Sequence, residues 1–194
     1  MATEKCTRRA LWNSLFLCAF AQVAAAEYAT ICTGYDHTCM IRDDLTTVYW
    51  GEELHGALGN GAESEESIGD GEDSDGYSFG DEEFTSELGD ALIPVDFGTG
   101  LTAKSISCDK NHTCAILSDD TTMCLGSGKY GVLGYGNTNN IDDSANETGD
   151  NLAAIDLGDG LTAKSVEIGT GHTCTILSDD SLKCWGRNYR GMLG

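Results

Sequence analysis

The chain has 194 residues, with 32 Asp and Glu against 11 Lys and Arg, and its formal net charge at pH 7 is −21. This length allows one domain with a real core. Nucleic acids and anionic membrane surfaces both attract cationic side chains, so this charge excludes nucleic-acid binding and disfavours membrane surfaces. The partners that the net charge favours are cations and basic protein patches.

The N-terminal residues 1–26 have the pattern of a secretory signal peptide. A basic stretch is followed by a short apolar run over residues 10–20 and then by three alanines, so we expect cleavage between Ala26 and Glu27 and a location outside the cell or on its surface. The apolar run is too short to span a bilayer, and no membrane insertion is expected. The alternative is a frayed amphipathic N-terminus of a cytosolic protein.

An internal repeat dominates the rest of the chain. LTAKSISCDKNHTCAILSDDTTMCLG, residues 101–126, recurs as LTAKSVEIGTGHTCTILSDDSLKCWG, residues 161–186, and a more diverged copy runs over residues 31–51. Each copy is followed by a short turn bracketed by glycines. This repeat predicts a division into signal peptide, first unit, acidic insert, second unit, polar connection and third unit: 1–26, 27–60, 61–91, 92–134, 135–151 and 152–194.

Each copy suits a β-hairpin followed by another strand. Residues 173–177 mix β-branched and apolar side chains, Ser-Asp-Asp supplies turn chemistry, and residues 182–185 resume an alternating strand. Short strands at regular spacing, punctuated by glycine, predict an all-β repeat architecture. One such unit leaves a sheet face uncovered, so neighbouring units must stack to bury it.

The run G-x-x-H-T-C-x-I-L-S-D-D…C-W-G-x-N-x-x-G-x-L-G over residues 169–194 resembles the repeat of the regulator of chromosome condensation family. It is most similar to the cysteine-bearing form of secreted members. The resemblance implies a β-propeller, usually of seven four-stranded blades. Because only about three units are found, we expect a partial β-propeller, an arc of an incomplete ring.

One histidine per unit falls in the same register: His37, His112 and His172. A metal site needs three or four converging ligands, so we interpret these residues as structural, each imidazole bonding backbone at a blade corner. Trp50 and Trp185 are expected to pack between blades. The glycines that follow each third strand are further framework positions: Gly51, Gly126 and Gly186.

Two cysteine pairs flank Ser-Asp-Asp turns at identical spacing, Cys114 with Cys124 and Cys174 with Cys184. Opposite positions on antiparallel strands bring Cβ atoms to roughly 4.5–5.5 Å, close to what a disulfide needs. Both pairs are therefore predicted to be disulfides that staple a hairpin.

The first unit departs from this pattern, because Tyr49 occupies the position of the second cysteine. Cys32, across the preceding turn, is then the partner expected for Cys39. Cys108 is left over, either free or paired outside this chain. A zinc site is the rival interpretation, but the sequence has no C-x-x-C knuckle.

The acidic insert is rich in Asp, Glu, Gly and Ser and cannot bury enough surface to order itself. Asp73, Asp75 and Glu82 faintly resemble a calcium loop, but position one and the flanking helices of such a loop are missing. We expect a solvated loop, with weak Ca²⁺ attraction as the alternative.

These features predict a non-catalytic secreted or cell-surface scaffold that binds a protein or a glycan. No nucleophile–base pair or phosphate loop stands out, so no enzyme activity and no cofactor are expected. Sequons at Asn111 and Asn146 predict N-glycosylation. Two alternatives stay open: guanine-nucleotide exchange on a small GTPase, which the resemblance implies from the family's founder, and an acidic Ca²⁺-associating extracellular protein.

Overall fold

A computed structural model describes the repeat units and leaves out the segments with the most biased composition. The described residues are 31–35, 37–51, 92, 94–142 and 147–194. The expected signal peptide, the calcium candidates Asp73, Asp75 and Glu82, and the sequon residue Asn146 lie outside them. Predictions on those residues stay predictions.

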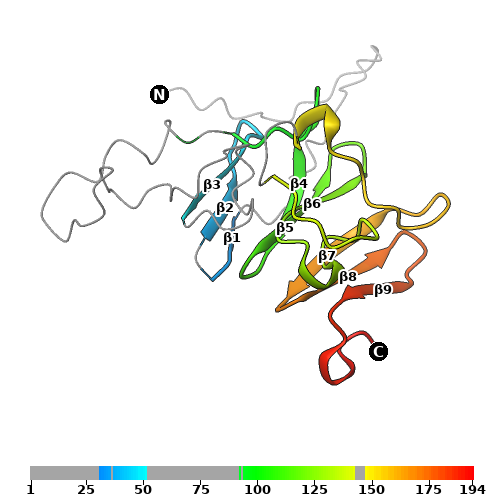
Figure 1. The fold of residues 1–194 in the computed structure, drawn as a ribbon. Helices are drawn as coiled ribbons and strands as arrows, with labels where there is room; N and C mark the ends of the chain where they lie inside the picture. Colours follow the sequence, from blue (N-terminus) through cyan, green and yellow to red (C-terminus); the bar gives the residue numbers. More distant parts are fainter. Residues whose placement is uncertain (1–30, 36, 52–91, 93, 143–146) are drawn as a thin grey trace, which may run out of the picture.

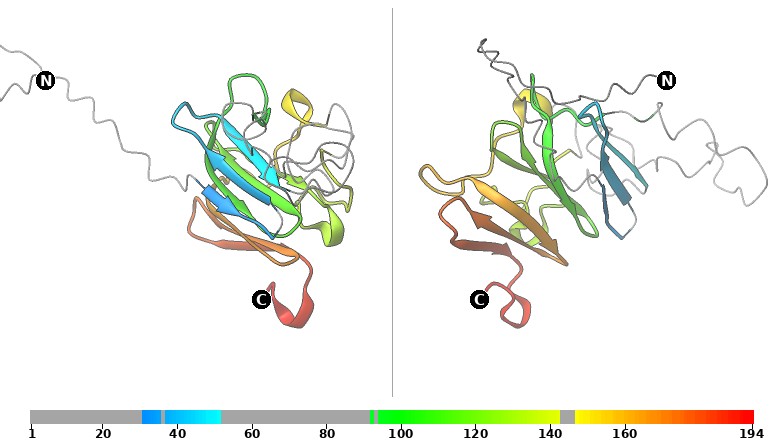
Figure 2. Two further views of the ribbon diagram at one scale, coloured as in Figure 1. Left: turned by 90° about the vertical axis from the view of Figure 1, so that its left-hand side faces the viewer. Right: turned by 180° about the vertical axis from the view of Figure 1, so that it is seen from behind.

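The described residues form nine strands in three antiparallel sheets, each built from three consecutive strands (Figure 1). We call these sheets blades 1, 2 and 3. Their strands are β1 Ile31–Thr33, β2 His37–Ile41 and β3 Thr47–Gly51; β4 Ala103–Cys108, β5 His112–Leu117 and β6 Thr122–Gly126; β7 Ala163–Gly169, β8 His172–Leu177 and β9 Leu182–Gly186. The blades follow one another in chain order, side by side (Figure 2).

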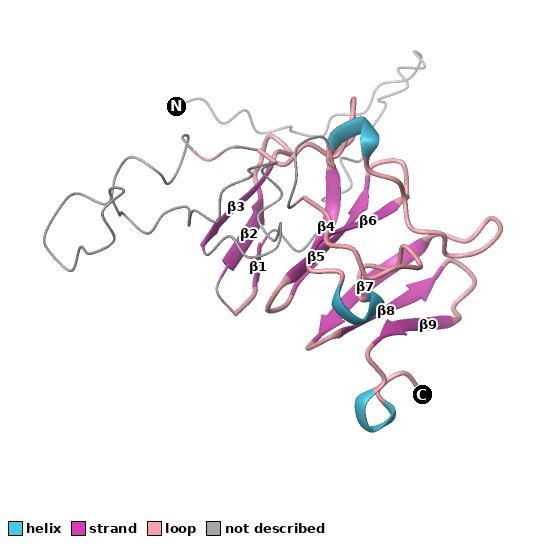
Figure 3. Cartoon of the chain, in the orientation of Figure 1, coloured by secondary structure: helices cyan, strands magenta, loops and turns pink. Residues whose placement is uncertain are grey.

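Helical structure in the described part of the chain is limited to three single 3₁₀ turns (Figure 3). They are η2 Lys129–Gly131, η3 Gly149–Asn151 and η4 Tyr189–Gly191. Among the residues described, none lies in a helix long and apolar enough to cross a membrane. The prediction of an all-β repeat fold is confirmed.

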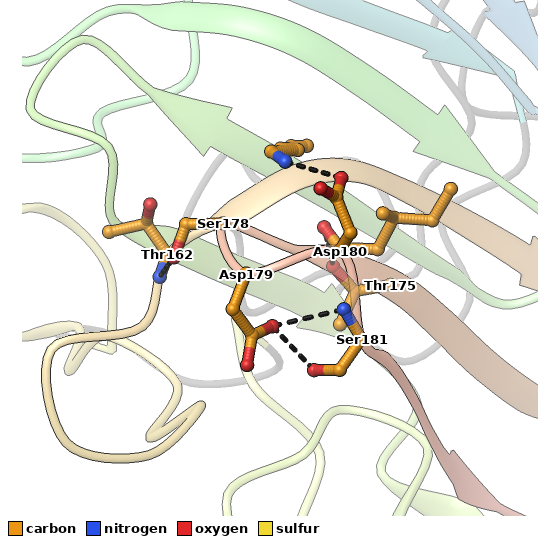
Figure 4. Close-up of polar contacts among 8 residues, drawn as sticks. Thr162, Thr175, Ser178, Asp179, Asp180 and Ser181 are labelled. Atoms are coloured by element: carbon orange, nitrogen blue, oxygen red, sulfur yellow. Dashed lines mark hydrogen bonds and ion pairs between the residues drawn. The ribbon is translucent and has the colours of Figure 1, made fainter.

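The hairpin turns follow from their Ser-Asp-Asp sequences. In blade 3, Asp179 Oδ1 accepts hydrogen bonds from the backbone N–H and the hydroxyl of Ser181, at 3.0 and 2.6 Å (Figure 4). These two bonds connect the first aspartate of the turn to the residue two positions later and so stabilise the turn, as expected for an Asp side chain in this position. Asp180 takes the left-handed conformation with φ of 69°, and its carboxylate pairs with Lys164 Nζ at 2.6 Å (Figure 4).

Two apolar cores lie between the blades. The first joins Cys39, Ile41 and Tyr49 of blade 1 to the inner side of blade 2, and the second joins blade 2 to blade 3. Each blade buries one face against the next, which is the stacking that a single unit requires.

The blades differ in one respect from the four-stranded form that the resemblance implied. Each sheet has three strands, and in blade 1 the next position is a single antiparallel bridge between Val48 and Pro94. In blade 2, the backbone N–H of Ile155 donates to the Thr122 carbonyl at 2.8 Å. The connecting segments therefore supply isolated backbone contacts where a fourth strand was expected.

Candidate functional site

The repeat histidines connect neighbouring blades. His37 Nε2 of blade 1 lies 3.1 Å from Thr113 Oγ1 of blade 2, and His112 Nε2 lies 3.2 Å from Thr173 Oγ1 of blade 3. The sequence predicted backbone partners at a blade corner. The structure gives each of these two imidazoles a threonine hydroxyl on the following blade.

The blade 2–3 seam fixes the protonation of His112. Thr173 Oγ1 donates its single proton to the Val132 carbonyl at 2.8 Å, so Nε2 of His112 must donate to Thr173 Oγ1. Burial lowers the pKa of His112 from 6.5 to about 4; His37 and His172 lower it too, whereas Asp109 opposes them. His112 is therefore a neutral hydrogen-bond donor at pH 7.

The tryptophan at the end of blade 3 joins the same seam. Trp185 is half-buried, and its Nε1 donates to the Val132 carbonyl at 2.7 Å. Trp50 holds the matching place in blade 1 and is also half-buried. The residue at the end of the third strand has to be a glycine, as blade 2 shows. At Gly126, which follows Leu125, φ is 103° and an added Cβ would lie 2.4 Å from the Asn111 carbonyl oxygen.

The cysteines of blades 2 and 3 lie opposite each other in their sheets. Cys114 pairs in register with Cys124, and Cys174 with Cys184, with Cα atoms 4.0 and 4.1 Å apart, and each pair forms a disulfide. Cys108 was expected to be free or paired outside this chain, but the structure places it at the blade 1–2 seam, beside Cys32 and Cys39.

Pairs of aspartates gather in the hairpin turns at one end of the blades. The β5–β6 and β8–β9 turns lie at one end and carry Asp119, Asp120, Asp179 and Asp180. Hydrogen bonds to the following Thr121 and Ser181 lower the pKa of Asp119 and Asp179. We call this the acidic end; Asp43 and Asp44 of blade 1 lie in the corresponding turn.

The opposite end combines exposed cations with exposed tyrosines. It holds the turns that precede β2, β5 and β8 and the segments that follow β6 and β9. We call it the basic–aromatic end. Its residues are Tyr35, Lys110, Lys129, Tyr130, Arg187, Tyr189 and Arg190.

Cation–π contacts link these side chains across the seams. Lys110 Nζ lies 4.7 Å from the ring centre of Tyr35, which joins blade 2 to blade 1. Arg187 Cζ lies 5.0 Å from the Tyr130 ring and 4.8 Å from the Tyr189 ring. Such contacts hold within about 6 Å. All three tyrosines stay exposed, at 75, 47 and 50%.

A hollow of about 220 Å³ opens at this end, between blades 2 and 3. Lys110, Lys129 and Arg187 contribute cations to its wall, Tyr130 an aromatic ring, and Asn111 a side chain whose buried Oδ1 lacks a hydrogen-bond partner. An orphaned acceptor of this kind calls for a donor. The sequon at Asn111 thus falls on a half-buried residue of this wall.

The loops that build the hollow hold two bulky residues in a rare backbone conformation. Tyr130 has φ of 66° and Arg190, at the equivalent place after blade 3, has φ of 61°. Non-glycine residues in this region cost of order 1–3 kcal/mol and cluster at binding sites. In both loops, the residue in this conformation is adjacent in sequence to its partner: Lys129 precedes Tyr130, and Tyr189 precedes Arg190.

Sequence reasoning missed this end because the net charge hid it. Four of the few cations gather here, while the hairpin turns at the other end carry pairs of aspartates. A signal was available: Lys129-Tyr130 and Tyr189-Arg190 fall at the same place in successive repeats.

Comparison with known proteins agrees with the geometry. Residues 163–191 match the family model described as Regulator of chromosome condensation (RCC1) repeat. Residues 163–191 therefore form an RCC1-type repeat. It is 31% identical over 96 residues to serine/threonine-protein kinase Nek8 of Danio rerio, a stretch that covers 50% of this chain and 13% of the kinase.

Solved structures show the same RCC1-type fold. Yeast RCC1 (Prp20), crystallised with Kap60, matches with a TM-score of 0.55 and 17% identity, over 81% of this chain and 32% of that one. Prp20p from Saccharomyces cerevisiae, studied for its binding to Gsp1p and histones, matches with a TM-score of 0.55 and 16% identity, over 84% and 33%. The chain thus spans about a third of the length of these structures.

Proposed function

We propose that this protein is a non-catalytic RCC1-type propeller scaffold outside the cell, and that its basic–aromatic end binds an acidic segment of a protein partner. The observation that carries the proposal is the row of exposed cations and tyrosines across the blade seams. Tyr and Arg supply much of the energy in protein interfaces.

The overall charge of −21 does not prevent this binding. At physiological ionic strength, charges further apart than about 8 Å are largely screened, so a bound carboxylate responds mainly to the cations beside it. Three cations and one carboxylate line the hollow, namely Lys110, Lys129, Arg187 and Asp109. The cations outnumber the carboxylate there, and the aspartate pairs of the hairpin turns lie at the far end of the strands.

The size of the hollow favours a protein partner over a free ligand. Small-molecule pockets usually measure about 300–1,000 Å³, whereas this one measures about 220 Å³. It suits one side chain of a docked segment.

The disulfides support the extracellular part of the proposal, because such bonds persist in oxidising compartments. The blade 2 and blade 3 pairs, Cys114–Cys124 and Cys174–Cys184, are the relevant ones. Protein sequencing of the secreted material tests this part: an N-terminus at Glu27 supports it, and an intracellular protein with reduced cysteines contradicts it.

The binding part is tested with a fluorescent Glu/Gly peptide and its Gln/Gly counterpart in about 0.15 M salt. We expect the Glu peptide to bind, and the double variant Lys129→Glu, Arg187→Glu to weaken binding at least tenfold. Lys183→Glu is the control, because it introduces the same kind of charge change on β9, away from the hollow.

Equal weakening by Lys183→Glu, or equal binding of both peptides, would overturn the proposed binding site. Preferential binding of uncharged oligosaccharides would favour the glycan alternative. Stimulated release of GDP from a small GTPase would favour the exchange-factor alternative over a passive scaffold.

A further inference from the structure

Three cysteines from two blades meet in the seam between blades 1 and 2. Cys32 lies on β1, Cys39 on β2 and Cys108 at the end of β4, and their sulfur atoms all lie within 4.8 Å of one another. Cys39 is fully buried, and the other two are half-buried. We call this group the cysteine triad.

Cys32 is placed to form a disulfide with either of the other two. Its Cα lies 5.4 Å from that of Cys39 and 5.9 Å from that of Cys108, and both separations fall inside the range usual for disulfides, about 4.4–6.8 Å. Because one sulfur takes part in one disulfide, the two bonds are alternatives.

The cysteine left out of the bond stays beside it. Cys39 Sγ and Cys108 Sγ are 3.2 Å apart, so whichever is the free thiol is in contact with the disulfide of the other. Blades 2 and 3 have no such arrangement, because their cysteines lie opposite each other in pairs. Blade 1 differs because Tyr49 replaces the cysteine opposite Cys39.

We propose that the cysteine triad is a thiol–disulfide exchange site in which Cys32 alternates between Cys39, within blade 1, and Cys108, across the seam. Cys39 loses its proton, and its thiolate attacks Cys32 Sγ. The Cys32–Cys39 bond forms as the Cys32–Cys108 bond breaks, and Cys108 leaves as a thiolate that takes up a proton. The number of disulfides is unchanged, so no external oxidant or reductant is consumed.

The two states differ in what they expose and in what they connect. With Cys32 bonded to Cys108, blades 1 and 2 are covalently joined and the free thiol is the fully buried Cys39. With Cys32 bonded to Cys39, the seam has no covalent link among the described residues and is held by non-covalent contacts such as His37–Thr113 and Lys110–Tyr35. The half-buried Cys108 is then the thiol that reagents in solution reach.

Peptide mapping of the unmodified full chain tests the exchange. The protein is equilibrated at about pH 8.5, quenched in acid, then denatured and alkylated with N-ethylmaleimide before digestion without reduction. We expect both the Cys32–Cys39 and the Cys32–Cys108 peptides, with one alkylated cysteine of the triad per molecule. Protein that is fully reduced and reoxidised should reach the same ratio of the two peptides.

Two single variants and an engineered protease site between residues 61 and 90 give a second readout. After quenching, cleavage and electrophoresis without reductant, Cys39→Ser should keep the two fragments linked. Cys108→Ser should release them, and the unsubstituted triad should divide between both bands. If either variant fails to fold, the peptide map of the unsubstituted chain still decides the question.

A single pairing in every molecule would overturn the proposal, because no exchange then occurs. Three alkylated cysteines together with one bound metal ion in the native mass spectrum would also overturn it, in favour of a thiolate metal site.

Discussion

Acidification tests the role of His112 in the seam between blades 2 and 3. Its pKa in the folded protein is about 4, below the ordinary 6.5, chiefly because the imidazole is buried. Protons therefore bind the unfolded chain more readily than the folded one between these two values. The contribution of His112 to stability is complete above pH 6.5 and is lost progressively as the pH falls toward 4.

The size of the effect follows from the two pKa values. Between pH 7.5 and pH 5.0, a group that titrates at 6.5 when unfolded and near 4 when folded lowers the free energy of unfolding by about 2 kcal/mol. The variant His112→Gln removes the titrating group and keeps an amide N–H that can donate to Thr173 Oγ1. Between pH 7.5 and pH 5.0, the unsubstituted protein should therefore lose about 2 kcal/mol more of its free energy of unfolding than the variant does.

Urea denaturation followed by circular dichroism at several pH values measures this difference. The two proteins share every ionisable group except His112, so the difference between their profiles reports His112 together with its coupling to His37 and His172. Parallel pH profiles for the two proteins would refute the reasoning, because His112 would then titrate alike in the folded and unfolded chains.

Three further substitutions test the seam and its framework. Thr173→Val leaves the buried His112 Nε2–H without an acceptor and should cost about 1–3 kcal/mol in urea denaturation, whereas the exposed Thr170→Val should cost little. Gly126→Ala places a Cβ 2.4 Å from a carbonyl oxygen and should lower the melting temperature well beyond Gly136→Ala, where nothing lies within 4 Å and only about 1–2 kcal/mol of backbone strain is added. Replacing Cys174 and Cys184 together by Ala removes a cross-link over 10 residues and should cost about 2–3 kcal/mol, an expectation that an unchanged denaturation midpoint would contradict.

The strands and turns of each blade were predictable because the sequence signals that specify them lie close together in the chain. The His-Thr-Cys run, the Ser-Asp-Asp turn and the following Cys or Tyr recur in one register, and hairpin geometry turns that register into paired strands. Contacts between blades were not predictable in this way. The spacing along the chain does not predict the hydrogen bond between His112 and Thr173, because this bond depends on how one sheet packs on the next.

The same reason explains the two features that sequence reasoning missed. Cys108 was left without a partner because its neighbours in space come from another repeat. The basic–aromatic end was hidden because a sum over all charges says nothing of where the chain places Lys129 or Arg187. A comparison of equivalent loop positions between the second and third repeats would have found this end, since both of these loops carry a cation beside a tyrosine.

The histidine–threonine bond also bears on how the chain tolerates insertions. It spans 76 residues from blade 1 to blade 2 and 61 residues from blade 2 to blade 3, yet its length is 3.1 and 3.2 Å. Each repeat carries both the imidazole for the seam ahead and the hydroxyl for the seam behind. The segment between two repeats can therefore lengthen or change composition during evolution while the geometry of the joint is preserved, which leaves the intervening segments free to diversify.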